Sequence, residues 1–286
     1  MQAPNPSDLS WDALRQFVLD SVDVIWLTTE EISAIASDLD LQFSFAFIGD
    51  ASGPVETKAS ARRSLASKGL VQDQSGELCL QPWFQVVVSV VTSPVIVVRV
   101  EHKDGPDHYE WTFFVDHLLG LQQQASDDGV VAWSPFDQSD LPSLLFEAGA
   151  LRDTKVSSLF DVNASFNTDL VSAIDDAIVK GDLLDAAEML CAAGVDQRFA
   201  NAYVGASADS RKGSALVVHD ARHEPALVTE IRWLELGEGQ YVQVSASPAD
   251  GSNLRLRSIA GMDIATQIAQ AVGVETDGLS EGEESP

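Results

Sequence analysis

Five histidines, two cysteines and many carboxylates are the side chains of this chain that could do chemistry. The best-spaced set is His219 and His223, four residues apart, with Asp220 or Glu224 beside them. Imidazole and carboxylate groups at that spacing can bind a divalent metal when they lie on a helix. The neighbouring residues instead predict a strand end and a turn, where two imidazoles four positions apart do not converge. We therefore expect polar surface histidines here and no metal site.

Nucleophilic and hydrolytic sites have no better support. Cys79 and Cys191 each lie inside an apolar run, where core packing is the expected role of a thiol. The chain has no G-x-S-x-G elbow, no P-loop and no G-x-G-x-x-G sequence. Adjacent acids such as Asp127-Asp128 are expected by chance in a chain with 44 acids. The sequence therefore predicts a protein that is not an enzyme, with no catalytic residue, metal or cofactor.

The chain is strongly acidic. It has 44 Asp and Glu against 17 Lys and Arg in 286 residues, a formal charge of −27. Such a surface repels polyanions, so general binding to nucleic acid or to anionic lipid is not expected. Apolar residues still make up 45% of the chain, enough for a large core. The N-terminus has no signal-peptide pattern and no apolar run is long enough to span a membrane, which predicts a cytoplasmic protein.

The segment from Lys58 to Val100 organises the elements that would hold any site. A helix opens the segment, and Gly69 follows its last turn at the position of a left-handed cap. Two valine-rich runs, 86–91 and 95–100, come next and are separated by Pro94. Because they are short and rich in β-branched residues, we interpret them as buried helix or strand pieces that feed a sheet.

The first forty residues predict a helix, a strand and a second helix. Ser7 or Ser10 can cap the first helix. Its apolar stripe consists of Trp11, Leu14, Phe17, Val18 and Val22. A strand is expected at 23–27, and Thr28 with Glu31 forms the capping box of the next helix.

Short strands are expected in both halves of the chain. Residues 41–48 alternate apolar with small or polar side chains, which is strand spacing. Between Val95 and Phe146, and again between Leu216 and Ala271, a meander of strands is closed by a helix. This repeated order predicts an α+β fold of two similar halves in a pseudo-twofold arrangement, with antiparallel sheets and packed helices. The expected parts are an N-terminal half at 1–155, a C-terminal half at 156–274 and a disordered acidic tail at 275–286.

One stretch favours a different class of protein, a winged-helix transcription regulator. The basic helix with Arg62, Arg63 and Lys68 is followed by Gly-Leu-Val, a turn and a strand. This is the order of a recognition helix and its wing, and the three cations could contact phosphates. On a chain of −27 they form a small basic patch, and a solvated helix face explains them as well.

Three stretches, in their order along the chain, are similar to those of a known family. They are LTTEEISAIASDLDL, SARRSLASKGLV and SVVTSPVIVVRVEHKDG. The first resembles the family's opening helix, and the second resembles a helix ending in Lys-Gly-Leu-Val. The third resembles a helix-to-strand step with a proline just ahead of the strand. Through these stretches the chain resembles the EspG family, the cytosolic chaperones of actinobacterial type VII secretion, from Trp26 to Val272.

The resemblance implies a monomeric or weakly dimeric α+β protein that works without a cofactor. It implies binding to the helical tip of a PE–PPE-type secretion substrate, shielding of its apolar surface and delivery to the secretion machinery. By this analogy, the loop at 101–109 and the last helices are the expected contact regions. The expected partner-binding residues are Glu101, His102, Lys103, Asp104, His108 and Tyr109. A protein-binding module that shares only the fold is a further possibility.

Overall fold

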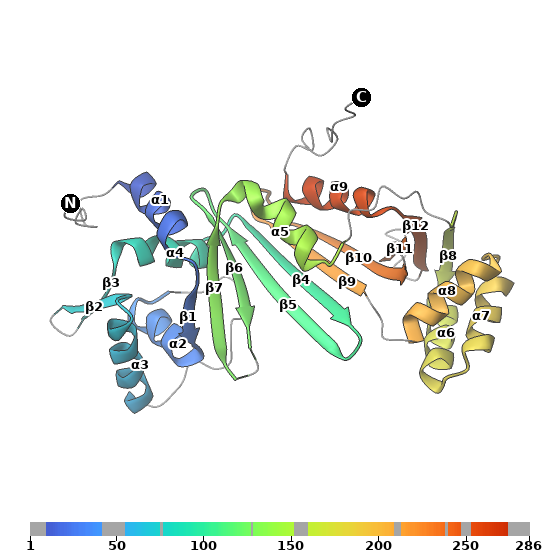
Figure 1. Cartoon of the computed structure of the whole chain (residues 1–286), viewed down its shortest axis with the longest axis horizontal. Coiled ribbons are helices and arrows are strands. Elements are labelled where there is room, and N and C mark those ends of the chain that lie inside the picture. Colours follow the sequence, from blue (N-terminus) through green and yellow to red (C-terminus); the bar gives the residue numbers. More distant parts are fainter. Residues whose placement is uncertain are drawn as a thin grey trace, which may run out of the picture. The chain divides into compact units, whose positions relative to one another are not determined.

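Runs of helices and runs of strands follow one another along the chain in the computed structural model (Figure 1). The structure describes residues 10–41, 55–74, 77–126, 128–151, 160–208, 213–237, 240–246 and 253–273. Within these ranges the chain forms nine α-helices, a sheet of ten strands and a separate two-stranded hairpin. The strand pairs are antiparallel. The expected α+β class with an antiparallel sheet is therefore confirmed.

Two units make up the chain. The first unit consists of Met1–Val98, Trp111–Leu141 and His219–Leu227. The second consists of Arg99–Glu110, Pro142–Val218 and Val228–Pro286. The boundaries expected from the sequence, 1–155 and 156–274, remain predictions. Residues 152–159, the acidic tail at 275–286 and most of the strand expected at 41–48 lie outside the described residues.

The first unit begins as the local sequence signals predict. Helix α1 spans Trp11–Ser21, and the Ser10 hydroxyl accepts a hydrogen bond from the Ala13 amide. Strand β1 (Ile25–Thr28) runs into helix α2 (Thr29–Asp38). Thr28 and Glu31 form both hydrogen bonds of the capping box, so this prediction is confirmed.

In the segment after α2, the valine-rich run at 86–91 forms a helix, whereas the run at 95–100 leads into a strand. Helix α3 (Val55–Ser67) ends at Gly69, whose φ of +70° is that of a left-handed cap. The hairpin β2 (Val71–Gln74) and β3 (Glu77–Leu80) follows, and then helix α4 (Pro82–Thr92). Pro82 in the first turn favours a helix start, and burial of Phe84 and residues 86–88 and 90–91 overrides the strand preference of valine.

Five strands form the sheet of the first unit, in the order β1-β7-β6-β5-β4. The strands β4 to β7 are Ile96–Asp104, Asp107–Val115, Gly120–Ala125 and Val130–Phe136. The outer parts of β4 and β5, Arg99–Glu110, belong to the second unit. Ile25 and Leu27 pair with Trp133 and Val131, so these four side chains share the sheet face that packs on α1–α4.

The second unit starts with strand β8 (Asn163–Asn167) and three helices that lie side by side (Figure 1). The helices are α6 (Thr168–Lys180), α7 (Leu183–Ala192) and α8 (Gln197–Ala208). Gly181, with φ +83°, ends α6 as a left-handed cap. Helix α8 was not predicted from the sequence. Its buried Phe199, Ala200, Tyr203 and Val204 complete the helical face that covers β8, β11 and β12.

The sheet of the second unit contains the outer part of β4 followed by β9-β10-β11-β12-β8. The strands β9 to β12 are Gly213–Asp220, Leu227–Gly237, Gln240–Ala246 and Asn253–Ile259. Helix α5 (Leu141–Ala148) follows β7, and helix α9 (Gly261–Val272) follows β12. The described part of the chain thus repeats one order, a strand, helices, four meandering strands and a closing helix. In each repeat the first strand pairs with the last strand of the meander, β1 with β7 and β8 with β12.

Candidate functional site

The six residues expected to contact a partner lie at the outer end of the β4–β5 hairpin. A loop was expected over 101–109, and the structure corrects this. Strand β4 continues through Asp104, β5 begins at Asp107, and only Gly105 and Pro106 form the turn. Gly105, with φ +69°, supplies the positive φ that a tight two-residue hairpin turn requires. Backbone pairing can therefore continue almost to the tip.

Strand alternation divides the six residues between the two faces of the hairpin. His102 and Tyr109 share one face, because their rings stack with centroids 6.3 Å apart at 19°. Asp104 follows His102 on that face, whereas Glu101, Lys103 and His108 belong to the other face. The structure therefore brings the expected residues together as two sets that point in opposite directions.

His102 holds the hairpin against strand β9. Its Nδ1 lies 2.9 Å from the Ser214 hydroxyl, which donates to the Gly149 carbonyl oxygen at 2.9 Å. Because the single hydroxyl proton goes to Gly149, Nδ1 must carry the proton of the His102–Ser214 bond. A histidine that donates to a serine cannot accept its proton, so this pair is not a nucleophile with its base. It positions the hairpin.

The other face of the hairpin carries charges that are paired along the sheet surface. The Arg99 guanidinium lies 2.8 Å from Glu110 and 3.4 Å from Glu101. The hydrogen bond to Glu110 raises the pKa of Arg99 above its already high value. On strand β10, Arg232 pairs with Glu230 at 2.5 Å. These half-exposed ion pairs contribute little to stability. A binding partner can therefore break them and form its own ion pairs with the same side chains at low cost.

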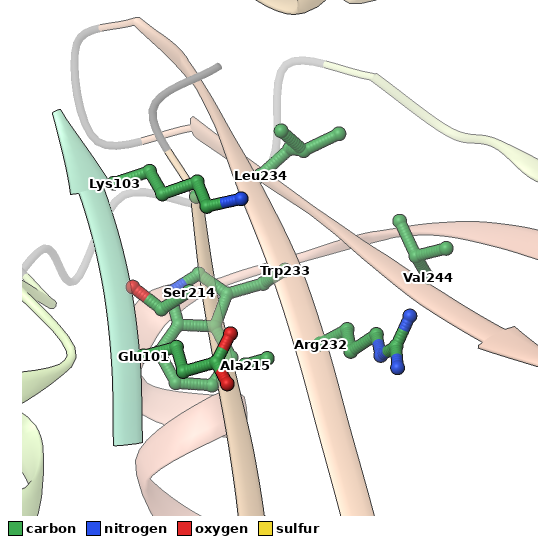
Figure 2. A pocket seen from close by; sticks show the side chains of 9 residues that line it. Glu101, Lys103, Ser214, Ala215, Arg232, Trp233, Leu234 and Val244 are labelled. Carbon is green, nitrogen blue, oxygen red and sulfur yellow. The ribbon is translucent and has the colours of Figure 1, made fainter. Parts of the chain in front are cut away.

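A pocket of about 350 Å³ opens on this charged face (Figure 2). Ala215, Leu234 and Val244 supply its apolar surface, from strands β9, β10 and β11. The charged side chains that line it are Glu101, Lys103 and Arg232. An apolar recess with both signs of charge suits an apolar side chain flanked by polar groups, as at a protein interface.

A second exposed feature of this unit is the turn that joins α6 to α7. Val179 and Leu184 are 72% and 69% exposed, and Leu183 is also exposed. Asp176, Asp182 and Asp185 surround them in sequence and are exposed as well. The sequence analysis missed this apolar turn. The available signal was that Val179 and Leu184 fall outside the buried stripes of their helices.

The side chains that the sequence suggested for metal binding or thiol chemistry make other contacts. Among the described residues, no group of three or more His, Cys, Asp or Glu side chains could hold a metal ion. Asp220 binds the Arg222 guanidinium through both oxygens and lies 3.5 Å from His223. Cys79 and Cys191 are half-buried free thiols, and the Cys191 thiol donates to Gln197.

Most of the cations of the helix that suggested a winged-helix protein form ion pairs within the first unit. Arg62 binds Asp38 at 2.5 Å, and Lys68 binds Glu31 at 2.7 Å. Lys68 also donates to the Trp26 carbonyl oxygen. Two of the three cations that could have contacted phosphate are therefore already paired with carboxylates.

Comparison with known proteins identifies the fold. No family model and no curated protein matches the chain. Among solved structures, the chain is similar to the Mycobacterium tuberculosis type VII secretion system chaperone EspG5, solved in complex with a PE25–PPE41 dimer. The match covers 87% of this chain and 95% of that chain, with a TM-score of 0.60 and 8% identity. The chain therefore has an EspG-like fold. In the part of the chain that the structure describes, no helix is long and apolar enough to cross a membrane.

Proposed function

We propose that this protein is a non-enzymatic cytoplasmic chaperone or adaptor of the EspG kind. It binds a helical, PE–PPE-like secretion substrate and keeps that substrate soluble for type VII secretion. The observation that carries the proposal is the β4–β5 hairpin. It presents a charged face and an apolar pocket on a fold similar to a chaperone solved with a PE25–PPE41 dimer.

The hairpin suits this role because its backbone is fixed before a partner arrives. The His102–Ser214–Gly149 hydrogen bonds and the His102–Tyr109 stack hold one face in place. The opposite face, with Glu101 and Lys103, remains available to a partner. A preformed surface loses little conformational entropy on binding, which favours affinity at a small interface.

Shielding a helix tip requires an apolar recess with a polar rim. The pocket of Ala215, Leu234 and Val244 fits one apolar side chain of the tip, and Glu101, Lys103 and Arg232 fit its polar neighbours. The exposed Val179 and Leu184 offer further apolar contact surface in the same unit. We propose that these residues, with the hairpin, contact the substrate.

The test is co-purification with the tagged chain from its native host at moderate salt, followed by mass spectrometry. A near-stoichiometric small helical protein is the expected result. In the same experiment Lys103→Glu should weaken the complex by about tenfold, because it reverses a charge at the pocket. Arg63→Glu, an equal charge change at an exposed position of α3 in the first unit, is the control for net charge. Recovery of nucleic acid, or of no partner above background, would overturn the proposal.

A purified PE25–PPE41 dimer is a second, direct probe. Saturable binding that Lys103→Glu weakens would show that the surface accepts this class of substrate. If the partner that co-purifies from the host is not a PE–PPE-like protein, the proposed chaperone function is rejected, although the EspG-like fold remains.

A further inference from the structure

A recess of about 380 Å³ lies in the first unit between helix α3 and the hairpin of β2 and β3, and we call it the α3 recess. Four residues of the helix and two of the hairpin line it: Ala59, Arg62, Arg63, Ala66, Val71 and Leu78. The positions 62, 63 and 66 follow position 59 by three, four and seven residues, so the helical wall is one continuous stripe. A recess of this volume is in the range of small-molecule sites.

Small side chains open the α3 recess, and core side chains form its floor. Ala59 and Ala66, at the two ends of the stripe, are exposed and extend no further than Cβ. Val71 and Leu78 are 5% and 8% exposed and belong to the buried core of the first unit. The apolar floor is therefore fixed before a ligand arrives, and little conformational entropy is lost on binding.

The charged residues of the α3 recess have the opposite sign to the chain as a whole. Two of the described residues that line it are arginines and none is an acid. Arg62 shares the Asp38 carboxylate with Lys58, at 2.5 Å from each cation. Arg63 is exposed, and in the described part of the chain its guanidinium has no hydrogen bond or ion pair. Three cations therefore surround one carboxylate here, on a chain of −27.

We propose that the α3 recess binds a small organic acid, with one carboxylate on an apolar body. The apolar body lies on Val71 and Leu78, and its removal from water supplies affinity. The carboxylate faces Arg63, whose planar guanidinium can donate two parallel N–H bonds to it. The site is separate from the substrate surface proposed on the second unit, so a change at Arg63 tests the two sites independently.

The floor and the cations together exclude other occupants. A phosphate, free or in a nucleic acid, can pair with Arg63 but gains nothing from the apolar floor. A neutral apolar molecule gains nothing from the arginines. An apolar cation is attracted by the field of the whole chain but repelled by Arg62 and Arg63. Because the net charge favours a cation, a preference for an anion can come only from the local arginines.

The experiment is isothermal titration calorimetry of the full chain with four probes: decanoate, decanol, decylamine and inorganic phosphate. We expect saturable binding of decanoate with a Kd of about 100 μM or lower. Decanol, decylamine and phosphate should each bind at least about tenfold more weakly. In a parallel NMR titration with decanoate, the amide chemical shifts should change most in α3, β2 and β3.

Variants locate the binding site. Ala66→Leu should weaken decanoate binding by about tenfold or more, because the longer side chain fills the recess. Its matched control is Ser67→Leu, the same residue at the next exposed position of α3, which does not line the recess. Arg63→Gln should also weaken binding by about tenfold, and Arg198→Gln removes an exposed cation of α8 as its control. Both controls should bind within about twofold of the parent chain.

Arg62 is left unchanged, because its loss would also remove a cation from the buried Asp38. Thermal unfolding of each variant is measured in parallel. If Ala66→Leu keeps both its unfolding temperature and its affinity for decanoate, the site is rejected. If Ala66→Leu unfolds, Arg63→Gln and the amide shifts decide, and shifts that are largest outside α3, β2 and β3 reject the site.

The probes and the charge control supply the other contradictory outcomes. Equal affinity for decanol or decylamine would mean an apolar recess that does not select an anion. Equal affinity for phosphate would mean a cationic surface that does not use the apolar floor. Equal weakening by Arg63→Gln and Arg198→Gln would reduce the effect to net charge. Each of these results, or the absence of saturable decanoate binding, would overturn the proposal.

Discussion

The helices that follow the first strand of each repeat use their charges in opposite ways. After β1, the acids of α2 are nearly buried and bind cations of α3. Asp38 lies 2.5 Å from both Lys58 and Arg62, and Glu31 lies 2.7 Å from Lys68. After β8, Asp176, Asp182 and Asp185 of α6, α7 and their connection are exposed beside the apolar Val179 and Leu184.

The difference separates structural charge from interaction surface. Buried ion pairs fix how α2 and α3 pack but leave no charge for a partner, because each carboxylate already has its cations. Exposed acids around apolar side chains do little for the stability of α6 and α7 and are open to another molecule. One order of elements thus supports a rigidly paired helix layer in the first unit and an accessible one in the second.

The largest expected effect is the loss of Lys68. In Lys68→Ala the Glu31 carboxylate, whose side chain is 2% exposed, keeps the Thr28 amide as a hydrogen-bond donor and loses its cation. A buried charge without its counter-ion is costly, so the free energy of unfolding should fall by about 2–3 kcal/mol. Urea unfolding of the full chain measures the loss, and hydrogen exchange should locate it in α2 and α3.

Two controls test the assignment of this loss to the ion pair. Lys180→Ala, at the exposed end of α6, should change stability by less than about 0.5 kcal/mol. The double variant Glu31→Gln with Lys68→Met should recover part of the Lys68→Ala loss, because no charge is then buried. Equal losses in the single and double variants would show that the ion pair contributes nothing specific.

The second prediction contrasts the pH limits of the two units. Burial raises the pKa of Tyr203 in α8 to about 12, and the nearby negative charge of Asp175 adds to the shift. A phenol whose folded pKa exceeds the unfolded value of about 10 stabilises the fold below pH 10, and this contribution is lost as pH rises toward 12. The free energy of unfolding of the second unit should therefore fall by up to about 2–3 kcal/mol between pH 10 and pH 12. In Tyr203→Phe the free energy of unfolding should depend less on pH over this range.

The loss of stability at acid pH is expected in the first unit. Burial of Asp38 opposes its ionisation, but hydrogen bonds and charge from Arg62 and Lys58 outweigh burial and hold its pKa below the usual value. A carboxyl with a lowered folded pKa contributes stability above the unfolded pKa, and the contribution is lost as pH falls through the folded value. Hydrogen exchange should show α2 and α3 opening first at acid pH. If Asp38→Asn leaves that opening unchanged, Asp38 isn't its cause.

Local signals in the sequence predicted much of the first unit. The Thr28–Glu31 capping box and the Gly69 cap depend on residues within one turn, so their residue types predict their structure. Helix α4 could not be distinguished from a strand, because five buried valines and a phenylalanine are apolar on every side and show no period. Helix α8 was missed because its mixed sequence carries Gly205 and a weak apolar stripe, and contacts with α6 and α7 stabilise it.

The candidate site could be predicted only as a segment. Alternation along 101–109 could assign side chains to faces, but the partners of those faces come from distant strands. His102 and Ser214 are 112 positions apart, and the pocket combines β4 with β9, β10 and β11. No local pattern indicates that Leu234 and Val244 lie next to Glu101, since sheet order is a property of the whole chain.

The third prediction tests whether the exposed α6–α7 turn has a role in binding. Leu184→Asp should leave stability within about 0.5 kcal/mol, because the side chain is 69% exposed. The same change should weaken the substrate complex by about tenfold, since it puts a charge in the apolar contact. Leu190→Asp, at a buried position of the same helix, should instead unfold the helices. Unchanged complex formation by Leu184→Asp would remove this turn from the proposed interface.

The smallest expected effect is a gain in the second unit. Gly205 lies inside α8, and a Cβ added there meets no atom within 4 Å. Gly205→Ala should therefore raise the free energy of unfolding by about 0.5–1 kcal/mol, because alanine loses less backbone entropy in a helix. The matched variant is Gly120→Ala in the first unit, where a Cβ would lie 2.1 Å from the Phe136 ring and should destabilise the sheet. Urea unfolding measures both. If Gly205→Ala raises stability and leaves substrate affinity unchanged, the exposed helices of the second unit bind through their surface, and flexibility of α8 is not required. If the same variant binds substrate more weakly, the flexibility of α8 is part of the site.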